Sequence, residues 1–270
     1  MKLISICPSN TELLAYLGLV DQLVAIDDFS DWPESVKSLP RLGPDLSIDI
    51  DKLESYNPDL VLASLSVPGM EKNIAELKKR RIPHIILDPQ NLDDISRDLL
   101  TVGKACNIEM KALQITKKYT SFISEMKKRA ATVKYQPTLY WEWWPKPIFT
   151  PGRINWLTEI SSIAGGLNEF RDINLANVQT DWDDILTRNP DYILLAWVGV
   201  RTNKVKKEVV LKRPGWQELS AIQNNRFPIM EEELYCRPSP RLLEGALKLA
   251  KTIHPDTYDD LTLPNWVSEI

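Results

Sequence analysis

Apolar positions recur at steps of three and four along residues 104–136, a stretch that contains neither glycine nor proline. This spacing is typical of an amphipathic α-helix, whose apolar stripe packs on a core while its charged faces meet water. The stripe consists of Ile115, Tyr119, Phe122, Ile123, Met126, Ala130 and Val133, and the other faces carry Lys117, Lys118, Lys127, Lys128 and Arg129. We predict a long helix over residues 107–134 that connects two halves of the chain. The alternative is an ordinary surface helix of a single domain.

A repeat on either side of this helix favours the connector. Residues 51–63 read DKLESYNPDLVLA and residues 183–195 read DDILTRNPDYILL. In both copies a short helical pattern ends before an Asn-Pro-Asp triplet, because the proline ring disfavours helix at the preceding residue. An apolar run typical of a buried strand follows each triplet. The matched order of helix, triplet and strand predicts two similar lobes, one on each side of the connector.

Short apolar runs alternate with helical patterns throughout both halves. The predicted strands are residues 3–6, 23–26, 60–63 and 84–87 before the connector, and 138–141, 192–196 and 227–230 after it. Strands that alternate with helices favour mainly parallel sheets. The predicted fold is therefore α/β, with two Rossmann-like lobes over residues 1–106 and 135–270 that are joined by the connecting helix 107–134.

Composition excludes several classes of protein. The net charge of −4 comes from interspersed residues of both signs, so no basic stripe indicates binding to nucleic acid. The three cysteines show neither a disulfide framework nor the spacing of a metal site. No apolar run approaches the roughly 20 residues that a membrane-spanning helix needs. We expect a monomer that is cytoplasmic as the chain is written, or extracytoplasmic if the sequence is a mature form cut at its start.

Catalytic motifs are absent as well. The ten glycines are scattered and form no loop that would bind phosphate, and the only histidines are His84 and His254. Neither lies near a serine or cysteine in a loop, so a hydrolytic triad is hard to assemble. We therefore expect no catalytic residue, no metal, no cofactor and no enzymatic activity.

Aromatic side chains follow the predicted strands. In open parallel sheets, ligands bind beyond the carboxyl ends of the strands. The residues at such positions are Trp32, Trp143, Trp144, Phe149, Trp197, Tyr235 and Arg237. Large aromatic faces are costly to leave exposed unless a planar or apolar partner covers them. We predict that these residues bind a large, flat, partly polar ligand in a cleft between the lobes.

An ordered set of motifs resembles one known family. The set is ISICPSNTE (residues 4–12), SDWP (30–33), NPD (57–59), IFTPG (148–152), GG (165–166) and SPR (239–241). It is similar to the substrate-binding proteins of ABC importers for cobalamin and ferric siderophores, the helical-backbone class III proteins. Their two α/β lobes are bridged by one long helix. The SDWP and IFTPG segments look most like the cobalamin-binding branch, and on that resemblance Trp32 and Phe149 contact the corrin. The other five site residues are assigned from position alone.

The sequence also departs from this family. Exported members carry a signal peptide or lipobox, and this sequence has none. Members present one glutamate per lobe to arginines of the permease, and these positions correspond to Asp51 and Asp183. The alternative role for both aspartates is to cap the short helices that follow. A tryptophan that contacts ligand in the cobalamin protein falls near Asn177, so the binding site differs from that of the family.

Three functions follow from these observations. The first is non-enzymatic binding of a corrinoid such as cobalamin, with an ABC permease as partner. The second is binding of a ferric siderophore or haem, but anionic siderophores favour sites with several cations, and only Arg237, Lys146 and Arg153 could serve. The third is a cytoplasmic corrinoid carrier or enzyme that reuses the fold, because fold alone does not determine function.

Overall fold

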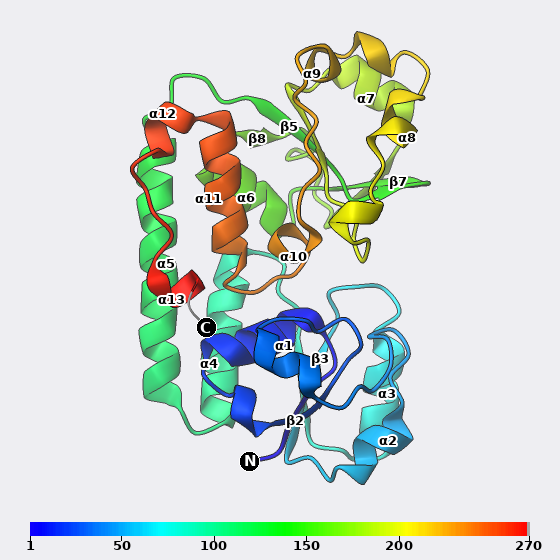
Figure 1. The fold of residues 1–270 in the computed structure, drawn as a ribbon, viewed down its shortest axis with the longest axis vertical. Helices are drawn as coiled ribbons and strands as arrows, with labels where there is room; N and C mark the ends of the chain where they lie inside the picture. Colours follow the sequence, from blue (N-terminus) through cyan, green and yellow to red (C-terminus); the bar gives the residue numbers. More distant parts are fainter. Residues whose placement is uncertain (269–270) are drawn as a thin grey trace. The chain divides into compact units, whose positions relative to one another are not determined.

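The computed structural model describes residues 1–268 and divides the chain into two compact units. Of the described residues, unit 1 comprises Met1–Thr120 and residues 265–268, and unit 2 comprises Ser121–Pro264. The helix α5, Glu109–Ala130, is continuous across the boundary (Figure 1). It lies within the predicted range 107–134, so the α/β class with a long helix between two halves is confirmed.

Unit 1 contains one parallel sheet in the order β2-β1-β3-β4. Its strands are β1 (Leu3–Ser5), β2 (Leu23–Ile26), β3 (Leu60–Ser64) and β4 (His84–Leu87). Its α-helices are α1 (Pro8–Tyr16), α2 (Ile50–Ser55), α3 (Glu71–Lys79), α4 (Leu92–Ala105), the first half of α5, and α13 (Asn265–Ser268), with short 3-10 helices at Val20–Gln22 and Glu34–Ser38. The four strands match the predicted ones.

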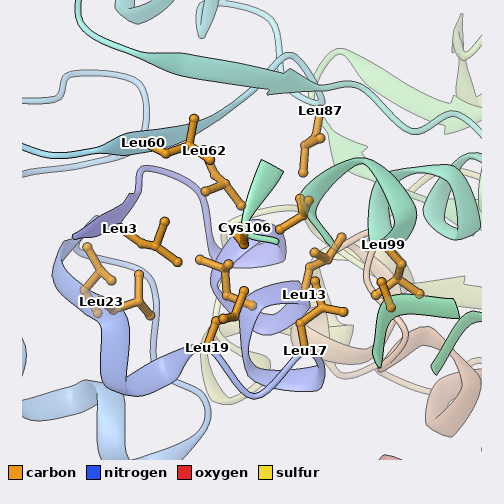
Figure 2. Close-up of a cluster of buried hydrophobic side chains, with 14 of the residues drawn as sticks. Leu3, Leu13, Leu17, Leu19, Leu23, Leu60, Leu62, Leu87, Leu99 and Cys106 are labelled. Atoms are coloured by element: carbon orange, nitrogen blue, oxygen red, sulfur yellow. The ribbon is translucent and has the colours of Figure 1, made fainter. Parts of the chain in front are cut away.

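Both faces of this sheet are covered, because alternate residues of a strand point to opposite sides. On one side Leu3 and Leu62 join a cluster with Leu13 and Leu17 of α1 and Leu99 of α4 (Figure 2). On the other side, Ile4 and Val61 pack with residues of α2 and α3. Such burial on both faces explains why the strands read as continuous apolar runs rather than as alternating ones.

The tail helix α13 belongs to unit 1, whereas the predicted boundaries place it in the second lobe. The Tyr16 hydroxyl donates to the Val267 carbonyl oxygen at 3.1 Å, and the Trp266 ring lies 6.0 Å from the Tyr16 ring. These contacts fasten the end of the chain to α1.

Unit 2 holds two small sheets rather than one. A parallel sheet has the order β10-β5-β8, and an antiparallel sheet has the order β6-β7-β9. The strands are β5 (Thr138–Glu142), β6 (Trp144–Pro145), β7 (Ile148–Pro151), β8 (Leu167–Asn168), β9 (Asn177–Thr180) and β10 (Tyr192–Leu195). The sequence analysis missed the antiparallel sheet, because its strands are short. The predicted strand at 227–230 is present only as a parallel bridge between Ile229 and Leu195, where Leu195 N–H donates to the Pro228 carbonyl oxygen at 3.1 Å and Met230 N–H donates to the Leu195 carbonyl oxygen at 2.9 Å.

The helices of unit 2 cover both faces of its parallel sheet. They are α6 (Trp156–Ile163), α7 (Trp182–Arg188), α8 (Lys207–Leu211), α9 (Ser220–Gln223), α10 (Glu232–Tyr235), α11 (Leu242–Ile253) and α12 (Pro255–Tyr258), with 3-10 helices at Thr202–Lys204 and Trp216–Glu218. Helix α11 lies against α6 (Figure 1). On the opposite face, Tyr140 and Ile193 belong to the cluster that includes Ile185 of α7 and Trp216.

The Asn-Pro-Asp repeat has the same structure in both units. Asn57 follows α2 and Asn189 follows α7, and both have positive φ (49° and 43°), a backbone conformation that asparagine tolerates better than most residues. Each triplet ends in an aspartate that accepts a backbone hydrogen bond. The Asp59 carboxylate accepts from Lys2 N–H at 2.6 Å, and the Asp191 carboxylate accepts from Thr138 N–H at 2.8 Å. The predicted repeat is therefore confirmed, and the two copies also share the positive-φ asparagine and the hydrogen bond that the aspartate accepts.

Candidate ligand-binding site

Two aromatic rings stand on one face of the antiparallel sheet in unit 2. Trp144 of β6 lies directly opposite Phe149 of β7, and residues directly opposite one another in antiparallel strands point to the same side. Trp144 is 42% exposed and Phe149 is half-buried, whereas Ile148 and Thr150 beside it face the interior. The Trp144 indole N–H donates to the Lys146 carbonyl oxygen at 3.1 Å, which fixes the ring over the turn. The face therefore offers a preformed aromatic surface.

Strand β9 extends this face with polar side chains. Gln179 lies directly opposite Phe149, and Asn177 lies directly opposite Pro151. Both side chains are exposed, while Val178 between them is buried. We call Trp144, Phe149, Gln179 and Asn177 the open face. The sequence reasoning missed Gln179, because β9 reads Asn-Val-Gln-Thr and has too few apolar residues to be recognised as a strand.

Trp143 is buried and holds the β6–β7 hairpin, which carries the aromatic part of the open face, in place. Its ring is buried and lies 5.4 Å from the Trp156 ring. The backbone N–H of Trp143 donates to the Phe149 carbonyl oxygen at 2.9 Å, and the backbone carbonyl oxygen of Trp143 accepts from Val198 N–H at 3.1 Å. Trp143 thus ties the β6–β7 hairpin to the segment that follows β10.

Trp197 is also buried, and a carboxylate holds its ring. The indole N–H donates to Glu142 Oε1 at 3.1 Å. Glu142, the last residue of β5, is fully buried and forms a bidentate ion pair with Arg213, in which Nη2 donates to Oε1 at 2.8 Å and Nη1 donates to Oε2. The Tyr140 hydroxyl donates to Oε2 at 3.0 Å, and burial raises the pKa of Tyr140 well above its usual value, so this hydroxyl keeps its proton.

Arg213 completes this buried cluster. Its guanidinium lies 4.3 Å from the centre of the Trp216 ring, a favourable stacking arrangement for arginine on an aromatic face. The sequence reasoning missed Glu142 and Arg213. A glutamate that ends an apolar strand signals a buried charge needing a partner, but the partner lies 71 residues away and no pattern identifies it.

Tyr235 and Arg237 are engaged in structural contacts. Tyr235 is 1% exposed, donates its hydroxyl hydrogen to the Gly245 carbonyl oxygen at 2.8 Å, and packs against Trp141. Arg237 is 8% exposed and forms an ion pair with Glu232 at 3.0 Å. Of the six predicted site residues in unit 2, Trp144 and Phe149 are thus the ones that present substantial surface.

In unit 1, Trp32 stands on a loop that a buried carboxylate organises. Asp27 follows β2, is fully buried, and accepts hydrogen bonds from Phe29 N–H at 2.8 Å, from Ser30 N–H at 3.0 Å and from the Ser30 hydroxyl. Burial raises the pKa of Asp27 to about 6, although the hydrogen bonds from Ser30 and Phe29 act in the opposite direction. Thr11 of α1 reaches the Ser30 hydroxyl at 2.6 Å.

This loop presents aromatic surface on unit 1. The Trp32 ring is partly exposed and lies 5.4 Å from the buried Tyr16 ring. Phe29, three residues earlier, is 48% exposed. The predicted position of Trp32 in a strand-end loop is therefore confirmed, and Phe29 is a further exposed ring that the sequence reasoning did not select.

The two predicted docking aspartates occupy equivalent places. Asp51 in α2 and Asp183 in α7 are both the second residue of their helix, and both are exposed. The N-caps are instead Asp49, which accepts from Lys52 N–H, and Asp181, which accepts from the N–H groups of residues 183 and 184. Asp51 and Asp183 are therefore not the N-caps that the alternative proposed, although both lie in the first turn, where a carboxylate meets the positive end of the helix dipole. Asp51 forms an ion pair with Arg80, whereas the carboxylate of Asp183 has no such partner among the described residues.

Other kinds of site receive no support from residues 1–268. No three His, Cys, Asp or Glu side chains in this range are grouped so that they could hold a metal ion. His84 and His254 each contact a backbone carbonyl oxygen, at 2.7 Å and 2.9 Å. Within the same range, no helix has both the length and the apolar character needed to cross a membrane.

Comparison with known proteins identifies the family. A family model described as periplasmic binding protein matches residues 3–234. An uncharacterised ABC transporter substrate-binding lipoprotein of Bacillus subtilis is 32% identical, over 96% of this chain and 82% of its own. A vitamin B12-binding protein of Yersinia pestis is 26% identical, over 93% of this chain and 85% of its own. A periplasmic heme-binding protein of Roseiflexus, whose structure is solved, is similar with a TM-score of 0.82 and 19% identity, over 95% of this chain and 98% of its own. The chain therefore belongs to the periplasmic binding protein family, the solute-binding proteins of ABC import.

Proposed function

We propose that this protein binds a corrinoid such as cobalamin and delivers it to an ABC permease. The observation that carries the proposal is the pair formed by the exposed Trp144 and the half-buried Phe149, which lie on the same face of the antiparallel sheet in unit 2. A corrin is a broad ring system, and stacking on aromatic side chains would bury both surfaces. Trp32 supplies a second aromatic surface on unit 1. That the ligand binds in a cleft between the lobes stays a prediction.

The charges near the open face favour a corrinoid over an anionic siderophore or haem. Of the three cations considered from sequence, Arg237 is buried in its ion pair with Glu232. Arg153 donates two hydrogen bonds to Asn174 Oδ1, at 2.7 and 3.1 Å. Lys146, in the turn of the hairpin, is the remaining one. Carboxylates of a ligand would require more cations than this. The named vitamin B12-binding relative supports the same ligand.

The corrinoid would be the transported ligand in this proposal, not a cofactor, and the protein would have no catalytic role. The relatives named above include a lipoprotein and a periplasmic protein, so we propose that the chain acts outside the cytoplasm. These names do not support the cytoplasmic location expected from the sequence. We further propose that Asp51 and Asp183 are the two acidic contacts with the permease, one per unit, because both are exposed and neither is needed as a helix cap.

A ligand titration tests the proposed corrinoid. Cyanocobalamin should quench tryptophan fluorescence saturably, and calorimetry should give the same dissociation constant. Replacing Trp144 by alanine should weaken binding about tenfold, which corresponds to 1.4 kcal/mol. The matched control is Trp182→Ala, because Trp182 is 40% exposed in the same unit but lies on α7, and it should leave the affinity unchanged. Saturable binding of haemin or ferrichrome without binding of cyanocobalamin would show the corrinoid assignment to be wrong.

A further inference from the structure

The open face ends in two uncharged amides, Asn177 and Gln179, and the strand pairing places these amides as definitely as it places the aromatic rings. Gln179 is the residue on β9 that lies directly opposite Phe149, so Trp144, Phe149 and Gln179 form one row across three strands. Side chains directly opposite one another have Cβ atoms about 5 Å apart. A ligand that stacks on Phe149 would therefore bring its rim within reach of the Gln179 amide.

Both amides are available for a ligand. Gln179 and Asn177 are exposed, and no hydrogen bond joins either side-chain amide to any residue between positions 1 and 268. A primary amide offers two donor hydrogens and an acceptor oxygen, so it can form a complementary pair of hydrogen bonds with another amide. A carboxylate offers only acceptors and would leave the amide oxygen of the protein unmatched.

The neighbouring residues strengthen this selectivity. Asn177 pairs with Pro151, and Gln179 pairs with Phe149, so the two cross-strand pairs carry no charge. The cation that follows β7, Arg153, already donates to Asn174. A ligand rimmed by carboxylates would give up hydration beside these two uncharged pairs, which is unfavourable, and Lys146 in the hairpin turn is a single cation against several carboxylates. A rim of carboxamides would lose less hydration free energy on binding, and its N–H and C=O groups would meet matching acceptors and donors on the two amides.

We propose that Gln179, assisted by Asn177, is a specificity-determining residue that binds carboxamide groups on the rim of the ligand and disfavours carboxylate-rimmed ligands of similar size. This inference rests on the proposed function, since it names the chemistry that the open face selects among flat ligands.

Two substitutions at position 179 test the inference with cyanocobalamin, which has a carboxamide rim, and haemin, which has a carboxylate rim. Gln179→Ala should weaken cyanocobalamin binding about threefold to tenfold, because a neutral hydrogen bond contributes about 1 kcal/mol. Gln179→Lys should weaken it at least as much and should also strengthen haemin binding relative to the unmodified protein. Gln223→Lys is the control for added charge, because Gln223 is exposed on α9, outside the antiparallel sheet.

The outcomes separate this inference from the proposed function. If cyanocobalamin binds and Trp144→Ala weakens binding, but neither variant at position 179 changes the affinity for either ligand, the amide edge is refuted and the corrinoid function stands. If the unmodified protein binds haemin and not cyanocobalamin, both ideas fail together. Thermal unfolding of each variant should match that of the unmodified protein, because the Gln179 side chain is exposed and forms no hydrogen bond with any residue from 1 to 268.

Discussion

Each unit buries one carboxylate at the end of a strand, directly before a loop with exposed aromatic side chains, but the two carboxylates are compensated differently. In unit 1, Asp27 accepts from hydroxyl and backbone N–H donors, and the nearby Arg41 donates to the carbonyl oxygens of Asp27, Ser30 and Lys37 rather than to the Asp27 carboxylate. In unit 2, Glu142 meets the guanidinium of Arg213 directly and also accepts from Tyr140 and Trp197.

The difference shows what hydrogen bonds alone can achieve for a buried charge. Three donors do not offset the loss of hydration at Asp27, and the pKa of its carboxyl remains raised, to about 6. A paired guanidinium supplies a full opposite charge. If either partner is removed, however, the other is left as an unpaired buried charge, which destabilises the fold. Unit 1 should therefore respond to pH at this position, and unit 2 should respond to the loss of either partner.

The largest effect should follow from Arg213→Met. It leaves Glu142 buried without its cation, which typically costs about 3 to 5 kcal/mol of unfolding free energy. Urea unfolding measures this change. Arg153→Met, which removes an exposed arginine from the same unit, should change stability by no more than about 0.5 kcal/mol. The double variant Glu142→Gln with Arg213→Met should recover part of the loss, because glutamine still accepts from Trp197. If Arg213→Met and Arg153→Met gave the same free energy of unfolding, the fold would not depend on the ion pair between Glu142 and Arg213.

An intermediate effect should appear as a change in pH dependence. The unfolded carboxyl of Asp27 loses its proton near its ordinary pKa of 3.8, and the folded one near 6, so the folded state binds more protons between these values. This group therefore stabilises the fold at low pH, and the contribution is lost as pH rises through 6. Between pH 5 and 7.5 the unmodified protein should lose about 1.4 kcal/mol that Asp27→Asn does not lose. Parallel pH profiles for the two proteins would argue against a buried, weakly compensated carboxylate.

The smallest effect on stability should come from the docking aspartates. Asp183→Ala should leave unfolding unchanged, and Asp51→Ala should lower stability only slightly, because its ion pair with Arg80 is exposed. The double variant should bind ligand normally yet fail to support uptake beside a cognate permease. Asp49→Ala and Asp181→Ala are the matched controls: each removes a true N-cap worth about 1 kcal/mol, and uptake should persist. Unchanged uptake in the double variant at 51 and 183 would rule out docking through these residues.

The sequence was a good guide wherever the signal was local. All four strands of unit 1, the long helix and the Asn-Pro-Asp repeat were predicted, because periodicity and proline act over a few residues. The antiparallel sheet of unit 2 was not predicted. Its strands have two to four residues, and β9 depends on pairing with β7 rather than on its own apolar content.

In the candidate site too, local sequence position indicated some residues, whereas others depend on partners that are distant in the sequence. Strand-end position selected Trp144, which is exposed, and Trp32, which is partly exposed, but it did not distinguish them from Trp197 and Tyr235, which are buried. Their burial depends on partners distant in sequence, such as Glu142 for Trp197. Gln179 became visible only through its register with Phe149. Pairing across strands is thus the information that the sequence pattern lacked.

The aspartate that ends each Asn-Pro-Asp triplet also fixes the register of two strands that are far apart in the chain. Asp59 and Lys2 immediately precede the first paired residues of β3 and β1, and Asp191 precedes β10 beside the start of β5. A shift of one residue would turn every side chain of a strand to the opposite face of the sheet. It would also separate this carboxylate from its N–H donor. A single side chain in each unit therefore opposes the most damaging error that pairing of parallel strands can make during folding.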